Sequence, residues 1–140
     1  MANLKSLIRF RKFEVDEKQR VLAALYEEAY KFEKRKSDIL DTIQAETKIA
    51  KKMASFEVLK QLGLYVQGAK MKLSEMDKIL ERLNLRIELA QNDLRLSFSE
   101  MKKIEILHGR RMSEQRAKNE AREEAIMNEI GIMLYNRDDN

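Results

Sequence analysis

Apolar residues recur every three or four positions through the second half of the chain. Counting alternately three and four residues from Val66 gives eleven further positions, of which ten are apolar and only Ser97 is polar. These positions are Ala69, Leu73, Met76, Leu80, Leu83, Ile87, Ala90, Leu94, Ser97, Met101 and Ile104. A strict seven-residue repeat of this kind, here called a heptad seam, predicts a helix that lies along a partner helix with a left-handed supercoil. Such a narrow stripe forms no core alone, so its partner is another part of this chain or another chain.

The first third of the chain carries a similar seam without proline or glycine. Eleven of its fifteen positions are apolar. They are Leu4, Ile8, Arg11, Val15, Lys18, Leu22, Leu25, Ala29, Phe32, Lys36, Ile39, Ile43, Glu46, Ala50 and Met53. This pattern predicts a first helix over about residues 3–53, with Asn3 or Ser6 as its N-cap.

The two seams do not share one phase, because the first continues from Ala50 to Glu57 whereas the second uses Leu59 and Val66. We therefore place a turn at about residues 54–58 and a second helix at about residues 59–135. The fold class predicted is all-α: an antiparallel two-helix coiled-coil hairpin, one domain over residues 1–140, with the second helix longer than the first. Facing residues then have numbers that add to about 112, and a register one heptad away is the nearest competitor.

This register pairs Phe32 with Leu80, Ala29 with Leu83, Leu25 with Ile87 and Leu22 with Ala90. It leaves the second helix without a partner over about residues 105–135. Residues 109–125 of this overhang are highly charged, and residues 126–135 are rich in apolar side chains. An apolar end on a polar helix predicts a binding partner, and self-association or folding back along the hairpin are the alternatives.

Composition agrees with long helices and argues against catalysis. There is no proline, cysteine or tryptophan, and 37% of the residues are charged. His108 is the only histidine, and its spacing from Glu105 is one half of a helical di-iron motif that needs two such pairs. We expect no enzyme activity, no cofactor and no metal. No apolar run is long enough to span a membrane, and the basic N-terminus lacks the apolar core of a secretory signal.

The net charge of +4 lies in the first 54 residues, which hold 13 basic and 9 acidic side chains. Basic clusters can meet an acidic partner or a phosphate backbone, but a solvated helix face is the explanation we favour. Acidic residues interleave with the bases and no recognition motif is present, so we expect no nucleic-acid binding. An amphipathic membrane helix over Leu4–Phe13 is an alternative, but the same segment extends the first seam.

Four stretches resemble the FliJ family of flagellar type III export proteins. They are Leu4-Lys5-Ser6-Leu7-Ile8-Arg9, Val15-Asp16-Glu17-Lys18-Gln19-Arg20, Ser97-Phe98-Ser99-Glu100-Met101-Lys102-Lys103-Ile104-Glu105 and Asn128-Glu129-Ile130-Gly131. The third stretch is similar to that family's Phe-x-x-x-Lys-Lys-hydrophobic-Glu segment and is the most specific of the four.

The resemblance implies a non-enzymatic, cytoplasmic component of the flagellar export apparatus, held peripherally at the inner membrane through its partners. Members resemble the central stalk of rotary ATPases, occupy the hexameric export ATPase ring, contact the cytosolic domain of the export gate and escort export chaperones. A related stalk protein serves virulence type III secretion systems.

From the shape expected of the hairpin, we assign two binding surfaces. The surface for the ATPase ring comprises Leu4, Ile8, Arg110, Arg111, Ile126, Ile130, Met133 and Leu134, and the surface for the export gate comprises Val58, Leu62 and Tyr65. The hypothesis from another class is a self-assembling structural coiled coil, in which the seams pair between chains in parallel dimers or in an extended antiparallel assembly.

Overall fold

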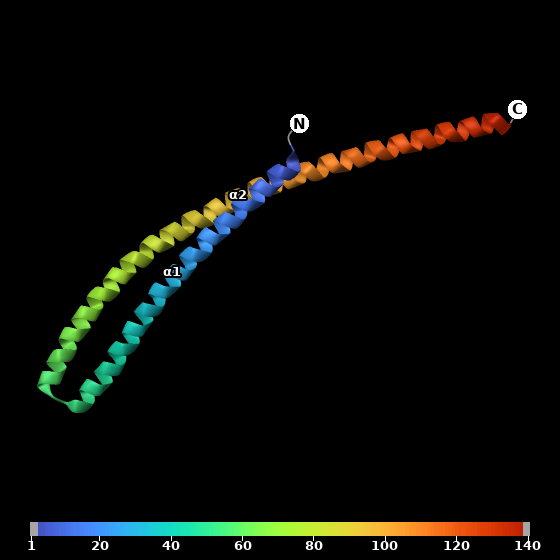
Figure 1. Cartoon of the computed structure of the whole chain (residues 1–140). Coiled ribbons are helices and arrows are strands. Elements are labelled where there is room, and N and C mark those ends of the chain that lie inside the picture. Colours follow the sequence, from blue (N-terminus) through green and yellow to red (C-terminus); the bar gives the residue numbers. More distant parts are fainter. Residues whose placement is uncertain (1–2, 139–140) are drawn as a thin grey trace. The chain divides into compact units, whose positions relative to one another are not determined.

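The structure is a computed structural model that describes residues 3–138, and these residues form two helices (Figure 1). Helix α1 spans Leu4–Met53 and helix α2 spans Phe56–Asp138. The two helices run antiparallel and pack against each other, and the second is the longer. The predicted all-α helical hairpin is confirmed.

Asn3 is the N-cap of helix α1. Its side-chain Oδ1 accepts a hydrogen bond from the Ser6 backbone N–H at 3.4 Å, and its carbonyl accepts one from the Leu7 N–H at 3.2 Å. One of the four N–H groups that a helix start leaves free is thereby satisfied by a side chain. Of the two caps predicted from the sequence, Asn3 is the one used.

The turn is shorter than the predicted residues 54–58, because it consists of Ala54 and Ser55 alone. Ala54 has a left-handed backbone with φ 48°, and its N–H donates to the Ala50 carbonyl at 3.3 Å. This arrangement ends a helix in the manner usually reserved for glycine, at a cost of about 1–2 kcal/mol for alanine. The Ser55 carbonyl then accepts the first hydrogen bond of α2 from Leu59 at 3.0 Å.

Near the turn the buried side of α2 departs from the predicted seam. Leu59, predicted to lie on the seam, is 46% exposed, whereas Val58 and Leu62 are half-buried. The half-buried residues Val58, Leu62 and Val66 are four apart, so Val58 takes the place that the seven-residue repeat gave to Leu59. At the far end, α2 continues to Asp138 rather than ending near residue 135.

The chain divides into two compact units that each take a piece of both helices. Unit 2 is Val15–Leu96, and unit 1 joins Met1–Glu14 to Ser97–Asn140, of which the structure describes residues 3–14 and 97–138. The division falls where the seams carry polar residues, at Arg11, Lys18 and Ser97. Apolar packing is weakest at such positions, which is the physical reason for a boundary there.

The core of unit 2 is one cluster of buried side chains from both helices. Its buried members are Leu25, Leu83, Ile87 and Ala90, and Leu22, Ala29, Phe32 and Ile79 pack against them. All but Ile79 are residues that the predicted register pairs, and Leu80, which it places opposite Phe32, is also buried. Two ion pairs across the helices agree with it: Lys36 with Asp77 at 2.6 Å, and Lys18 with Asp93 at 3.9 Å.

Lys36 explains how a charged residue is tolerated on the seam. The hydrogen bond to the Asp77 carboxylate, reinforced by its negative charge, raises the pKa of the Lys36 ammonium above its ordinary value. The Lys36 side chain remains partly exposed, so its methylenes cover the neighbouring seam while its charge stays hydrated.

Within unit 1, the first turns of α1 pack on α2, and α2 then continues alone. Met101 is buried, Ile104 is half-buried, and Lys12 pairs with Glu105 at 3.9 Å. Every residue from Gly109 to Asp138 is exposed, and we call this stretch the unpaired segment. At 1.5 Å per residue it is about 45 Å long. It starts later than the predicted residue 105, because Glu105 and His108 are still half-buried.

Candidate functional site

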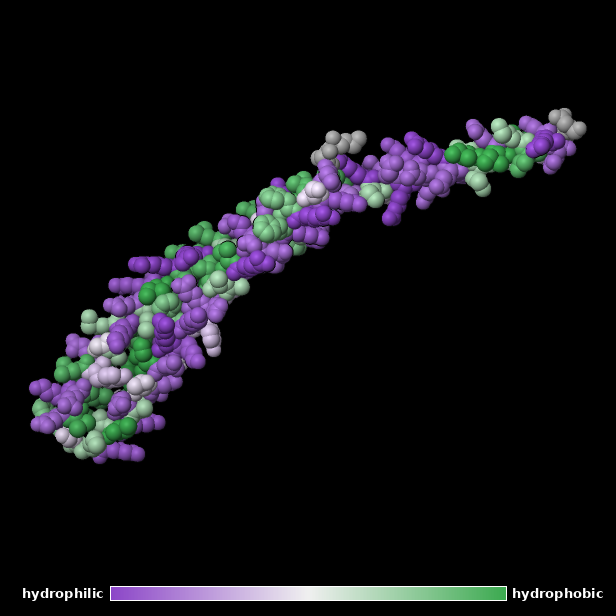
Figure 2. Space-filling view, viewed as in Figure 1, coloured by the Kyte–Doolittle hydropathy of each residue, from purple (hydrophilic) through white to green (hydrophobic). Residues whose placement is uncertain are grey.

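The last turns of the unpaired segment form an apolar surface that no other described part of the chain covers. We call Ile126–Tyr135 the apolar tip. Its seven large apolar side chains are between 47% and 70% exposed. They are Ile126, Met127, Ile130, Ile132, Met133, Leu134 and Tyr135. Figure 2 shows this patch in green near the end of α2, beyond a stretch that is almost wholly purple.

The last turn of the apolar tip has no polar face, whereas its first turn carries the polar side chains of Asn128 and Glu129. Residues 132–135 are four consecutive large apolar side chains, and an α-helix has 3.6 residues per turn, so these four point in all directions around the helix axis. A surface helix buries one stripe, whereas a helix that is apolar on every side is surrounded in its functional state. The tip therefore fits a partner that encloses it better than one that covers a single face.

Residues 109–125, which precede the apolar tip, form a highly charged and fully exposed stretch of helix. Residues 109–125 hold nine charged side chains, and all 17 residues are exposed. Arg110 and Arg111 lie at the start of this stretch, about 15 residues or roughly 22 Å before Ile126 along the helix. The predicted ring-binding residues therefore fall into separate places along unit 1.

Four of those predicted residues, Ile126, Ile130, Met133 and Leu134, lie together in the apolar tip. Leu4 and Ile8 do not, because both are half-buried on the side of α1 that packs against α2. Much of the surface of these two side chains is therefore covered by α2. The other three side chains of the tip, Met127, Ile132 and Tyr135, belong to the apolar stretch 126–135 that the sequence predicted to bind a partner, although they were not among the individual residues assigned to the ring.

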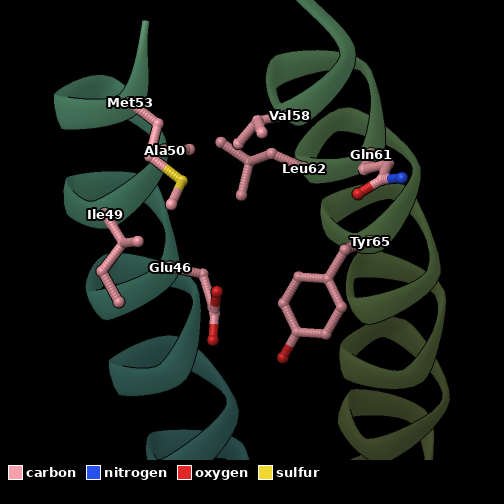
Figure 3. Close-up of a pocket in the computed structure, with 8 residues that line it drawn as sticks. All are labelled: Glu46, Ile49, Ala50, Met53, Val58, Gln61, Leu62 and Tyr65. Atoms are coloured by element: carbon pink, nitrogen blue, oxygen red, sulfur yellow. The ribbon is translucent and has the colours of Figure 1, made fainter. Parts of the chain in front are cut away.

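The predicted gate-binding residues come together in a groove next to the turn, within unit 2. Figure 3 shows Val58, Leu62 and Tyr65 of α2 facing residues of α1 across an open space of about 490 Å³. The groove is lined by Glu46, Ile49, Ala50, Met53, Val58, Gln61, Leu62 and Tyr65. Glu46 is the only charged residue of this lining.

The groove exists because the seam is not filled at this end. Glu46 and Met53 occupy seam positions of α1 but are exposed, and the small Ala50 lies between them. The phase difference between the two seams was the sequence signal for this gap. It was used to place the turn, and Ile49 and Met53 were therefore not recognised as walls of a groove.

Among residues 3–138, no group of three or more His, Asp and Glu side chains is placed to hold a metal ion. His108 lies beside Leu4 and Arg111 along a shallow groove of unit 1. In the same described range, no helix has a stretch apolar and long enough to cross a membrane.

Comparison with known proteins adds no relative to this picture. No protein-family model, no curated protein and no solved structure matches the chain. The assignment of a function therefore depends on the two surfaces described above and on the residues that resemble the FliJ family.

Proposed function

We propose that this protein is the stalk of a hexameric ATPase in the flagellar type III protein export apparatus. The observation that carries the proposal is the apolar tip, whose last turn, residues 132–135, is apolar on every side and which stands at the end of a charged, unpaired helix. The central pore of a ring encloses a helix from all directions, and a long solvated helix gives the tip the reach to enter it.

The energetics of a ring favour this partner over a second copy of the tip. An antiparallel contact along ten residues covers one face of each helix and leaves the opposite apolar side chains in water. Specific dimers bury about 1,200–2,000 Å² in total, which so short a contact between two helices does not supply. A pore lined by six subunits covers all seven large apolar side chains at once.

The groove beside the turn supports a second contact, with the cytosolic domain of the export gate. It offers apolar walls from Met53, Val58 and Leu62, with the polar groups of Glu46 and Tyr65 at one end. Apolar walls with a few polar groups are the usual composition of a recognition groove. In this proposal the protein works on the cytoplasmic side of the inner membrane and is held there by its partners.

Escort of export chaperones follows from the family resemblance alone, and we assign no surface to it. The stalk of a virulence secretion system would use the same two surfaces, and only the partner proteins differ. The self-assembling coiled coil is less well supported, because both seams of unit 2 are already satisfied within one chain.

The test is ATP turnover by the cognate flagellar export ATPase, measured with the full chain and with a chain that ends at Leu107. We expect the full chain to stimulate turnover and the shortened chain to have lost this effect. Circular dichroism is the control, since residues 109–138 are all exposed and their removal leaves the core of unit 2 intact. Equal stimulation by both chains, or by neither, contradicts the proposal.

A further inference from the structure

The first turns of α1 present a second apolar surface, on the side that the hairpin does not use. Phe10 and Phe13 are 53% and 60% exposed, whereas Ile8 and Arg11 are half-buried toward α2. Residues three apart are neighbours on a helix surface, so the two rings lie side by side. The first turns of α1 therefore have two different faces. One face packs on α2 as part of the heptad seam, and the other is exposed.

The N-terminal side of this face is basic. Residues 3–12 hold four basic and no acidic side chains, namely Lys5, Arg9, Arg11 and Lys12. The acidic residues Asp16 and Glu17 follow Phe13 by three and four positions, so the basic character is confined to the first turns of α1.

Ion pairs already use much of the acidic charge. Glu14 pairs with Arg11 at 3.2 Å, and Glu105 pairs with Lys102 at 3.1 Å and with Lys12 at 3.9 Å. Glu100 pairs with Lys103 at 3.5 Å. By contrast, the ion pairs formed among the described residues involve neither Lys5 nor Arg9, nor Arg110 or Arg111. The positive charge next to Phe10 and Phe13 is thus available to an external anion.

We propose that this face, made of Phe10 and Phe13 with Lys5, Arg9 and Lys12 beside them, binds the surface of an anionic lipid bilayer. The two rings enter the boundary between headgroups and acyl chains, and the bases meet lipid phosphates. Exposed aromatic residues flanked by Lys and Arg on one face of a helix are a pattern of interfacial membrane binding. Each basic side chain near an anionic surface adds about 1 kcal/mol to the free energy of membrane binding.

A bilayer fits these charges better than a nucleic acid does. Tight binding to a phosphate backbone requires a track of bases that matches fixed phosphate positions, typically through 6–10 contacts. Here the few unpaired bases come from two helices. Lipids diffuse in the plane of the membrane and can meet any arrangement of charges. The proposal is independent of the proposed function, since it uses neither the apolar tip nor the groove beside the turn.

The test is co-sedimentation of the full chain with vesicles of phosphatidylcholine containing about one-third phosphatidylglycerol, against vesicles of phosphatidylcholine alone. We expect binding to the anionic vesicles only, weakened by salt, and a drop of about tenfold or more for the double variant Phe10→Ser/Phe13→Ser. The matched control is Leu85→Ser/Leu89→Ser, since these leucines of unit 2 are 58% and 65% exposed. The control is expected to bind like the wild type.

A tryptophan reporter gives a second readout. The chain has no tryptophan, so Phe13→Trp provides a single indole whose emission shifts to the blue when it enters a bilayer. The proposal is overturned if neither vesicle binds, or if Phe10→Ser/Phe13→Ser binds like the wild type. It is also overturned if a single-stranded oligonucleotide removes the protein from vesicles and if binding of that oligonucleotide requires the two phenylalanines. Stacking of nucleobases on the two rings would then explain why they are exposed.

Discussion

Replacing Ile126, Ile130 and Leu134 with serine is expected to abolish binding to the export ATPase ring without changing the fold. Each of these side chains is about half exposed in the free chain, so its burial in a pore contributes about 1–2 kcal/mol. Losing three such contributions weakens binding by more than about 100-fold. Serine and isoleucine have similar helix propensities, so far-UV circular dichroism remains near that of the wild type.

The control for this variant is serine at Leu85, Leu89 and Leu96 of unit 2. These leucines are between 58% and 68% exposed, so the triple replacement removes the same kind of surface from another place. Pull-down with the immobilised ATPase hexamer is the measurement. Retained binding by the tip variant, or equal loss by the control, would rule out the tip as the contact.

The single substitution Leu83→Ala is expected to lower the free energy of unfolding by about 2–5 kcal/mol. Leu83 is 3% exposed and packs in the cluster with Leu25 and Ile87, where alanine leaves a cavity between the helices. The free energy of unfolding of domains of this size is about 5–15 kcal/mol, so the loss is a large part of the total. Urea unfolding followed by circular dichroism measures it.

Leu85→Ala is the matched control for this stability prediction. Leu85 is two residues away on the same helix and is 58% exposed, so we expect a change within about 0.5 kcal/mol. Similar losses at positions 83 and 85 would show that α2 does not pack on α1 through the predicted seam.

Periodicity predicted the paired part of the fold well, because burial there repeats every seven residues. Leu83 and Ile87 were predicted on the seam and are buried against α1. Periodicity failed near the turn. A strict seven-residue repeat places Leu59 on the seam, but the half-buried residues there are Val58, Leu62 and Val66, which are four apart. The left-handed Ala54 that ends α1 has no glycine to mark it in the sequence, so the bounds of the turn were also missed.

The candidate surfaces were predictable only in part, for a different physical reason. The seven-residue repeat identifies only the apolar residues on the helix face that packs in the hairpin. It therefore did not identify Phe10 and Phe13, which lie on the opposite face of α1. Residues 126–135 were recognised as an apolar end that predicts a partner, but the last turn, residues 132–135, was not recognised as apolar on every side of the helix. Exposure of each side chain, which the sequence does not give, separates these surfaces from the core.

Thiol labelling tests the central claim, that a partner encloses the apolar tip, most directly. The chain has no cysteine, so Ile126→Cys, Met127→Cys, Ile132→Cys and Tyr135→Cys each give a single reactive group, and the four positions point in different directions around α2. The rate of reaction with a maleimide is compared with and without the export ATPase hexamer. We predict that all four rates fall by about tenfold or more. Protection on one face only, or no protection at any position, would contradict enclosure of the tip by a ring.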